Sequence, residues 1–161
     1  MKVITALTGH TDPRRYGEPV LLVVHHTGSF SLASALQELG RRKLSYHYVI
    51  EQDGLVWKLA PVAEAARHAG VCERADGRIR PVNQRSIGVA WVGGVTESWR
   101  PTTWQMGALQ ELAAELRRGT PSLRYVAGHK DLTRRKVDPR SVDVEELARI
   151  TGLEAWRRET A

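Results

Sequence analysis

The sequence has a single cysteine, Cys72, among its 161 residues. An internal disulfide needs two cysteines and a zinc-finger type of site needs several, so both are excluded as sources of stability. Long apolar runs are also missing. Residues 20–24 form one of the longest, far below the roughly 20 residues that span a bilayer, so we expect no transmembrane segment. Any metal site must be built from the 6 histidines and the carboxylates.

The N-terminus lacks the apolar stretch and small-residue cleavage site of a signal peptide. We therefore expect synthesis in the cytoplasm, with a substrate outside the cell reached only after release by other means. Residues 1–19 carry the turn-forming residues Gly9, Asp12-Pro13 and Gly17, which predict an irregular N-terminal lead-in. The remaining length suits one domain with a proper core, which we place at residues 20–150, followed by a tail at 151–161.

The sequence has fewer acidic than basic residues: 18 aspartates and glutamates against 24 lysines and arginines, which gives a formal net charge of +6. A basic surface attracts polyanions, and both nucleic acid and the anionic polymers of a cell wall satisfy that description. Charge alone does not choose between them. No nucleic-acid-binding fold signature accompanies the charge, so we expect no nucleic-acid partner, and a metal-dependent nuclease is the weaker interpretation.

Alternation and β-branched runs predict strands over residues 20–24, 46–50, 55–59, 86–92 and 124–127. Asp53-Gly54 is a hairpin signal between the second and third of these strands. Helical periodicity predicts a helix from residue 32 that Gly40 stops, a short helix at 62–67, a long helix closed by Gly119, and a last helix at 142–150. The expected N-caps are Ser31, Thr102 or Thr103, and Ser141. This order of elements predicts one α/β domain with a central mixed β-sheet flanked by helices.

Two polar clusters follow predicted strands, where functional groups are often placed. His25 and His26 end a buried strand, and successive strand side chains point to opposite faces, so only one of them can enter a given site. Spacing leaves open which one, and two ordinary histidines at a strand edge explain the pair equally well.

The second cluster is Gly128-His129 followed by Lys136-Val137-Asp138-Pro139. If the intervening loop folds back, His129 and Asp138 meet. Zinc accepts imidazole and carboxylate ligands and uses three protein ligands at catalytic sites, and Lys136 beside it would stabilise charge on a carbonyl oxygen. Taken alone, however, this stretch is read more simply as a solvated basic loop.

The combination of these clusters in this order resembles the amidase-2 family: N-acetylmuramoyl-L-alanine amidases, especially small bacteriophage endolysins, and the related peptidoglycan recognition proteins. The matching stretches are VVHHTG at 23–28, SYHYVI at 45–50 with Asp53-Gly54, RHAG at 67–70, NQRSIGV at 83–89, Gln105, GHKD at 128–131 and KVDP at 136–139. Each stretch is weak alone, but together they cover nearly everything from residue 20 to 138.

The resemblance implies a Zn²⁺ site and an assignment for each matching residue: metal ligands His25, His129 and Asp138, catalytic residues Tyr46 and Lys136, and substrate-lining residues His26, Thr27 and His68. It implies a zinc-dependent hydrolase that cleaves the amide between N-acetylmuramic acid and L-alanine in bacterial peptidoglycan, of the phage or prophage endolysin type, acting as a monomer. The alternative is a non-catalytic peptidoglycan-binding or polymerase-binding module of the same fold. Recognition proteins without activity typically lack the third ligand, so Asp138 favours the enzyme.

Overall fold

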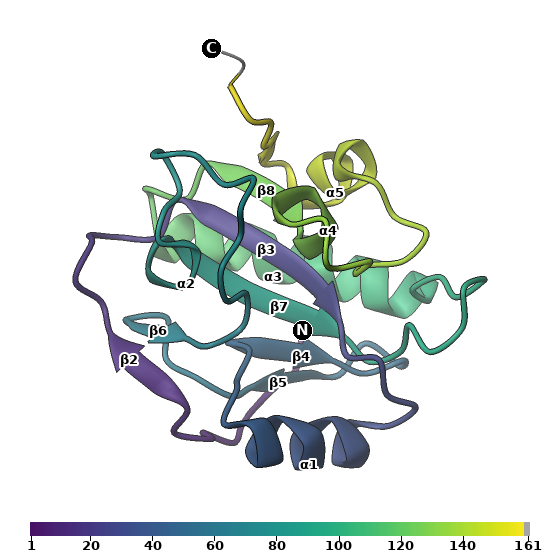
Figure 1. The fold of residues 1–161 in the computed structure, drawn as a ribbon. Helices are drawn as coiled ribbons and strands as arrows, with labels where there is room; N and C mark the ends of the chain where they lie inside the picture. Colours follow the sequence, from purple (N-terminus) through teal and green to yellow (C-terminus); the bar gives the residue numbers. More distant parts are fainter. Residues whose placement is uncertain (160–161) are drawn as a thin grey trace.

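The computed structural model describes residues 1–159 and confirms the predicted class, a mixed β-sheet flanked by helices (Figure 1). Within these residues the main sheet has seven strands in the order β1-β5-β4-β7-β3-β8-β9. Their bounds are β1 Val3–Thr5, β3 Leu21–His26, β4 Tyr48–Ile50, β5 Val56–Lys58, β7 Ser86–Trp91, β8 Tyr125–Gly128 and β9 Glu154–Ala155. A second sheet pairs β2 Thr11–Pro13 with β6 Glu64–Ala66.

The centre of the sheet is the parallel trio β7-β3-β8, in which β3 is hydrogen-bonded on both sides. Its residues from Leu21 to Val24 are fully buried. A strand covered on both faces requires a continuous apolar run rather than alternation, which is the pattern that predicted it. The hairpin at Asp53-Gly54 is also confirmed, because β4 and β5 are antiparallel and Gly54 has a φ of 87° that suits glycine.

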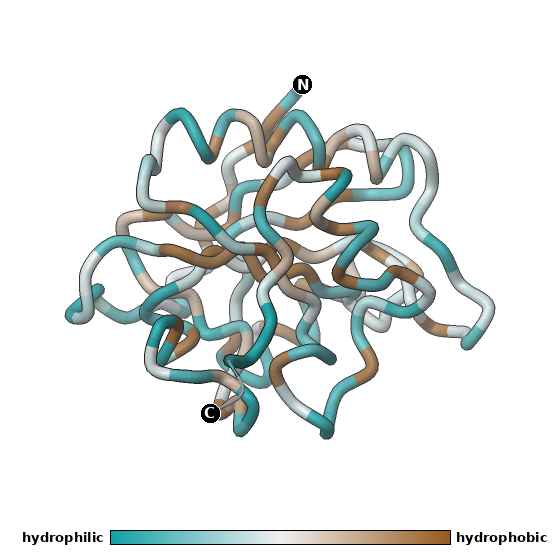
Figure 2. Tube along the Cα trace, turned by 90° about the horizontal axis from the view of Figure 1, so that it is seen from above, coloured by the Kyte–Doolittle hydropathy of each residue, from teal (hydrophilic) through white to brown (hydrophobic). Residues whose placement is uncertain are grey.

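The helices cover both faces of the sheet. Helix α3, Thr103–Gly119, packs its buried leucines against the even-numbered side chains of β3, while α1, Leu32–Arg42, packs Leu39 on Val49 and Ala90 from the opposite face (Figure 1). The short α2, Val82–Arg85, and α4, His129–Leu132, and the helix α5, Val144–Thr151, complete the set. Figure 2 shows the apolar segments concentrated inside the fold and the hydrophilic ones toward its outline. None of the described helices combines the length and apolar character needed to cross a bilayer.

Two predicted N-caps are confirmed. The Ser31 side chain accepts from the Ser34 N–H, and Thr102 forms a capping box with Gln105. Gln105 is fully buried, and its amide donates to the carbonyls of Ile50 and Val92 at 3.1 and 2.9 Å. The start of α3 is therefore attached to the ends of β4 and β7.

Two predicted helix boundaries are wrong. Helix α1 does not stop at Gly40 but continues to Arg42, because Lys43 takes the left-handed conformation that ends it. The last helix begins at Val144 with Asp143 as its N-cap, since Asp143 accepts from the Glu146 N–H, whereas Ser141 lies outside the helix with a φ of 62°.

The predicted helix at 62–67 is also wrong, because Glu64–Ala66 forms β6. Alanine favours helices, but here Ala65 and Ala66 are buried and pair antiparallel with β2, so tertiary pairing overrides propensity.

The N-terminal region is not an irregular lead-in: β1 pairs in parallel with β5, and β2 lies in the second sheet. At the other end β9 pairs with β8, so the sheet extends beyond residues 20–150 in both directions. Residues 160 and 161 of the predicted tail lie outside the described residues.

Candidate active site and metal centre

Sheet register brings two of the predicted ligands together. Strands β3 and β8 are parallel neighbours, and Val24 is paired with Gly128. The next residue on each chain is a histidine, so His25 and His129 emerge side by side at the carboxyl edge of the sheet. Their ring centroids lie 4.7 Å apart and both side chains are buried. The contact follows from backbone pairing and does not depend on a mobile loop.

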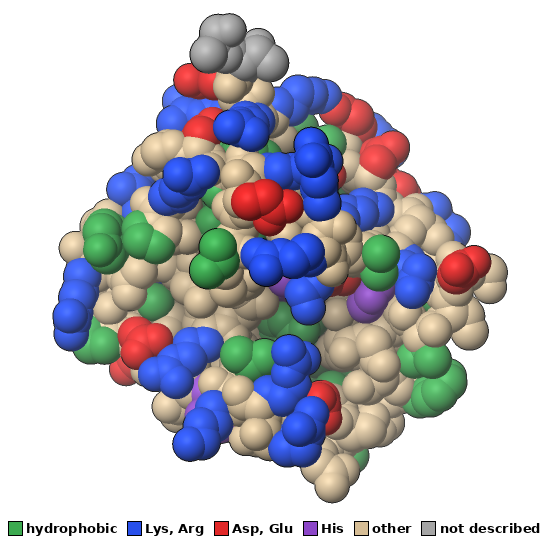
Figure 3. All heavy atoms as spheres, viewed as in Figure 1, with side chains coloured by type: hydrophobic (Ala, Val, Ile, Leu, Met, Phe, Trp, Pro, Cys, Tyr) green, Lys and Arg blue, Asp and Glu red, His purple; other side chains and the backbone are tan. Residues whose placement is uncertain are grey.

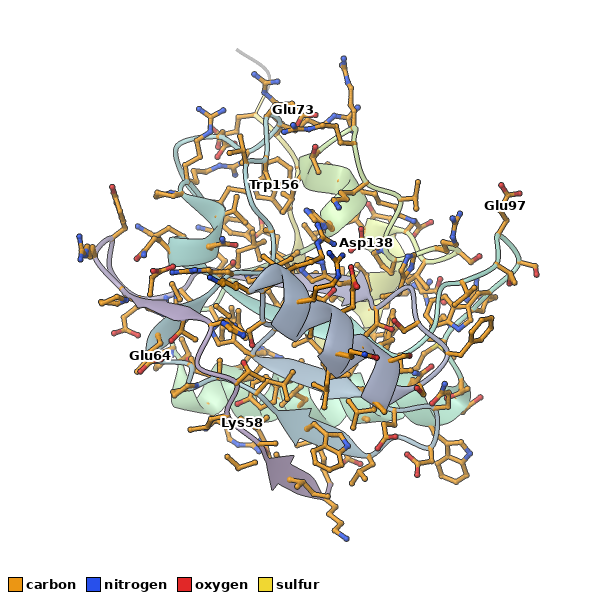
Figure 4. The ribbon with its side chains drawn as sticks, turned by 60° about the horizontal axis from the view of Figure 1, so that its bottom comes forward. Lys58, Glu64, Glu73, Glu97, Asp138 and Trp156 are labelled. Carbon is orange, nitrogen blue, oxygen red and sulfur yellow. The ribbon has the colours of Figure 1, made fainter. Side chains whose placement is uncertain are left out.

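Asp138 reaches the same point because the segment after α4 folds back on β8. The Lys130 N–H donates to the Asp138 carbonyl at 2.9 Å, and the Lys130 ammonium donates to the Pro139 carbonyl at 2.7 Å. Gly128 makes this approach possible: a Cβ there would stand 2.8 Å from the Pro139 Cδ. Figure 4 shows Asp138 near the middle of the molecule, in contrast to the peripheral Glu97.

The carboxylate of Asp138 faces the Nδ1 atoms of both histidines. Its Oδ2 lies 2.8 Å from His25 Nδ1 and 3.3 Å from His129 Nδ1, and one ligand atom from each of the three residues lies within 4.8 Å of the others. All three residues are buried. A buried carboxylate between two imidazoles is the type of donor set that binds Zn²⁺.

The proton positions support the same conclusion. His129 Nε2 lies 3.0 Å from the Ala69 carbonyl, which can only accept, so Nε2 carries a hydrogen, and in the neutral ring Nδ1 is the lone-pair nitrogen that faces Asp138. Burial lowers the pKa of His25 to about 4, so that this imidazole is neutral at pH 7. A neutral imidazole lone pair and a carboxylate facing each other repel unless a cation lies between them. The residues therefore fit a metal ion.

One cleft contains the whole set of predicted site residues. It encloses about 760 Å³, and its lining includes the three metal-ligand candidates together with Tyr46, Lys136, His26, Thr27 and His68. A hollow of about 870 Å³ between β1, β5 and α3 is larger, but the His25, His129 and Asp138 group does not line it. We therefore place the candidate active site in the smaller cleft.

Tyr46 and Lys136 approach the metal-ligand group from different sides. The ring of Tyr46 lies 4.9 Å from that of His25, and burial, together with the charge of Asp138, raises the pKa of its hydroxyl. The hydroxyl therefore stays protonated at neutral pH. Lys136 lies two residues before Asp138 and is exposed on the cleft wall, where its ammonium remains free to meet a ligand.

The structure distinguishes the two adjacent histidines. His25 is 1% exposed and shares the face of β3 on which the metal-ligand group lies, whereas His26 points to the other face. The ring of His26 packs edge-on against Trp99 at 5.7 Å, and its Nδ1 accepts from the Arg140 N–H at 3.0 Å. His26 is thus held beside the cleft and away from the metal position.

His68 lines the cleft, but protein groups occupy both of its ring nitrogens. Nδ1 lies 2.9 Å from His25 Nε2, and Nε2 lies 2.9 Å from the Ser86 hydroxyl oxygen. No ring nitrogen is left for a ligand. The predicted contact of His68 with substrate is untested and stays a prediction, as it does for His26 and Thr27.

Sequence reasoning missed Arg42 and Arg135, which also line the cleft. Figure 3 shows lysine and arginine side chains gathered around the histidine atoms visible on this face. Arg135 belongs to a basic run that was interpreted as solvated, and Arg42 lies beyond the glycine that was predicted to end its helix. A correct end for α1 would have been the signal for Arg42.

Comparison with known proteins shows which family this chain resembles. The family model for N-acetylmuramoyl-L-alanine amidase matches residues 15–141. Solved structures with the same fold include AmpD, with 26% identity over 92% of this chain and 94% of that chain and a TM-score of 0.76. An endolysin from a Thermus scotoductus bacteriophage has 24% identity over 93% of this chain and 99% of that chain, with a TM-score of 0.67.

A third solved structure, the Drosophila peptidoglycan recognition protein SD, has 18% identity over 99% of this chain and 97% of that chain, with a TM-score of 0.63. Among curated proteins no sequence matches significantly. The family match nevertheless covers most of the chain, including all the residues of the metal-ligand group. The chain belongs to the N-acetylmuramoyl-L-alanine amidase family, amidase-2.

Proposed function

We propose that this protein is a zinc-dependent N-acetylmuramoyl-L-alanine amidase of the endolysin type. Its substrate is bacterial peptidoglycan, and the bond that it hydrolyses joins the lactyl group of N-acetylmuramic acid to the L-alanine of the stem peptide. The observation that carries the proposal is the buried group of His25, His129 and Asp138 at the base of a cleft. The family match and the likeness to AmpD and to a phage endolysin support it.

His25, His129 and Asp138 would hold the metal through two nitrogens and one oxygen, which leaves room for a ligand from solvent or substrate. When bound, zinc supplies Lewis-acid chemistry, polarising a carbonyl and activating water at neutral pH. The protein contributes rigidity. Both histidines are fixed by the pairing of β3 with β8, so no reorganisation of the ligands accompanies the reaction.

Lys136 is the group that we assign to the developing oxyanion. Hydrolysis of an amide passes through a tetrahedral species whose oxygen gains negative charge, and an ammonium positioned there stabilises the transition state more than the ground state. Lys136 lines the cleft two residues from Asp138, and it makes no hydrogen bond or ion pair within the described residues that would hold it elsewhere. Loss of a donor of this kind costs about 10²–10³ in turnover.

Tyr46 enters as a hydrogen-bond donor. Its raised pKa makes the free hydroxyl a poor base at neutral pH. The Tyr46 ring centroid lies 4.9 Å from that of His25, and a protonated hydroxyl on this ring is suited to orient the attacking water or to assist proton transfer to the leaving amine. The strand end at β7 reads Ala90-Trp91 and offers no carboxylate for this task. We therefore assign proton handling to the Tyr46 and Lys136 pair.

The charge of the cleft suits peptidoglycan. Arg42, Arg135 and Lys136 line it, and Asp138 is the acidic residue in its lining. Stem peptides and wall polymers carry carboxylates and phosphates, so this cleft and the net charge of +6 would hold the enzyme on the wall. His26 and Thr27 would contact the substrate at the cleft edge. Because salt screens such attraction, wall binding weakens as ionic strength rises.

A non-catalytic wall-binding module is the second candidate, favoured by the likeness to a peptidoglycan recognition protein. Asp138 argues for the enzyme, because it completes a three-residue ligand set. Zinc content and turbidity of a wall suspension separate the two. The enzyme binds one zinc per chain and clears the suspension, and His25→Ala loses both properties while His10→Ala, outside the cleft, keeps them. A protein that adsorbs to walls without clearing them would refute the enzyme.

A further inference from the structure

A line of hydrogen-bonded side chains runs from the back of His25 into the protein. His25 Nε2 lies 2.9 Å from His68 Nδ1, and His68 Nε2 lies 2.9 Å from the Ser86 hydroxyl oxygen. The Ser86 hydroxyl in turn donates to the Val82 carbonyl. All three side chains are buried, so water does not complete their hydrogen bonds. The line ends on a backbone atom that cannot rearrange.

The end of the line determines where each proton lies. The Val82 carbonyl can only accept, so the single Ser86 proton points toward it. The Ser86 oxygen must then accept from His68 Nε2–H. A buried, neutral His68 has no second proton, so its Nδ1 is a lone pair and accepts from His25 Nε2–H. The remaining nitrogen of His25, Nδ1, is left as a lone pair facing Asp138.

The packing holds His68 in the one orientation that this chain of protons requires. Its ring lies directly over Gly88 of β7, where a Cβ would stand 2.5 Å from the His68 Cγ. The Asn83 side-chain oxygen accepts from the backbone N–H of His68 at 3.3 Å and from that of Ala69 at 2.8 Å. The missing side chain at Gly88 and the Asn83 contacts thus fix both the ring and the backbone that carries it.

We propose that His68, supported by Ser86, is a positioning residue that sets the tautomer of His25, so that Nδ1 is always available to the metal. This role differs from the substrate contact that the resemblance implies, and it rests on the proposed zinc function. His129 needs no such relay, because the Ala69 carbonyl fixes its tautomer directly. Outer partners of this kind typically contribute about 10- to 100-fold to metal affinity.

Two substitutions at position 68 separate the proton relay from simple packing. In His68→Asn the side-chain oxygen occupies the place of Nδ1 and still accepts from His25 Nε2–H, whereas His68→Leu fills the space without an acceptor. His47→Leu is the matched control, because His47 is also fully buried but bonds to the Glu64 carbonyl and the Gly88 N–H rather than to the metal-ligand group.

The first measurement is the ¹⁵N NMR spectrum of the histidine rings in metal-free protein. We expect His25 to carry its proton on Nε2 in the wild type and in His68→Asn, and to populate the Nδ1–H form in His68→Leu and in Ser86→Ala. A wild-type His25 protonated on Nδ1 overturns the proposal. Because no metal takes part, this result is independent of the proposed function.

The second measurement is the zinc dissociation constant by competition with a chelator. We expect it to rise about 10- to 100-fold in His68→Leu and to return close to the wild-type value in His68→Asn, with His47→Leu unchanged. If His68→Leu does not fold, Ser86→Ala carries the same test. A folded His68→Leu or Ser86→Ala variant that binds zinc as tightly as the wild type refutes the relay. A wild type that binds no zinc refutes the proposed function and leaves the NMR result to decide the relay.

Discussion

Replacing Asp138 by asparagine should stabilise the metal-free protein and abolish zinc binding. When both rings are neutral and carry their hydrogen on Nε2, the Asp138 carboxylate, which is 7% exposed, faces two unprotonated Nδ1 atoms in the metal-free site. An amide nitrogen in place of Oδ2 has two hydrogens and would stand 2.8 and 3.3 Å from the two Nδ1 atoms. The substitution thus converts a repulsive arrangement into one with two hydrogen bonds.

The expected size follows from those two bonds. Each contributes about 0.5–1.5 kcal/mol, so the asparagine protein should gain about 1–3 kcal/mol when zinc is absent. For a domain of this length that is a rise of about 2–12 °C in Tm. Zinc reverses the order, because a ligand at a thousand times its Kd stabilises the wild type by about 4 kcal/mol and has no complete site in the variant.

Thermal unfolding at pH 8 measures the Tm difference between variant and wild type under both conditions, with chelator and with excess zinc. We expect Asp138→Asn to melt above the wild type in chelator and below it in zinc. Asp138→Ala is the control, because it removes the carboxylate without supplying donors and leaves a cavity. An asparagine variant that is less stable than the wild type in chelator would show that the carboxylate is stabilised without a metal, contrary to the converging lone pairs.

Three further predictions concern other residues. Lys136→Ala should lower amidase turnover about 10²–10³-fold with unchanged zinc stoichiometry, and equal loss of metal would contradict its assignment to the oxyanion. Burial lowers the pKa of His47 to about 4, whereas the unfolded chain titrates near 6.5, so the unfolded state binds more protons between these values and stability falls as pH drops through this window. His47 alone should account for about 2 kcal/mol of the loss at pH 5 in urea denaturation, and His47→Asn should remove that share of the pH dependence. Gly88→Ala should lower the free energy of unfolding by about 1–3 kcal/mol, because the added Cβ meets His68. Gly107→Ala should raise it, because a Cβ at this position in α3 meets nothing within 4 Å. Similar losses in both variants would refute the packing argument.

The parallel core could be predicted because its pattern is local. The apolar run that becomes β3, the hairpin at Asp53-Gly54 and the capping residue Thr102 each depend on neighbours in the sequence. The N-cap Ser31 is likewise predicted from its neighbours in the sequence. The structure confirms these features, and the α/β class follows from them.

The errors lie where distant pairing decides the structure. The alanines of β6 are strand residues because β2 lies beside them, and β1 is a strand because β5 is. Neither pairing strand can be recognised from the short stretch of sequence around β6 or β1. The end of α1 depends on Lys43 accepting a left-handed backbone, which propensity disfavours.

In the candidate site, too, local sequence predicts some features and distant pairing decides the others. The residue types at 25, 129 and 138 suggested metal chemistry, but only the register of Val24 with Gly128 determines that His25, and not His26, faces His129. The resemblance to the amidases selected the same residue without that geometry. The role of His68 was not accessible from sequence, because it depends on the Ser86 hydroxyl at one ring nitrogen and His25 at the other.

Mass spectrometry of digested peptidoglycan tests the central claim most directly. The zinc-loaded protein should separate the stem peptide from the sugar at the lactyl amide and release free amino-terminal L-alanine. Chelator should abolish the release, added zinc should restore it, and Asp138→Asn should show none. A folded protein with one bound zinc that leaves every stem peptide attached to muramic acid, or cleaves a different bond, would contradict the amidase assignment.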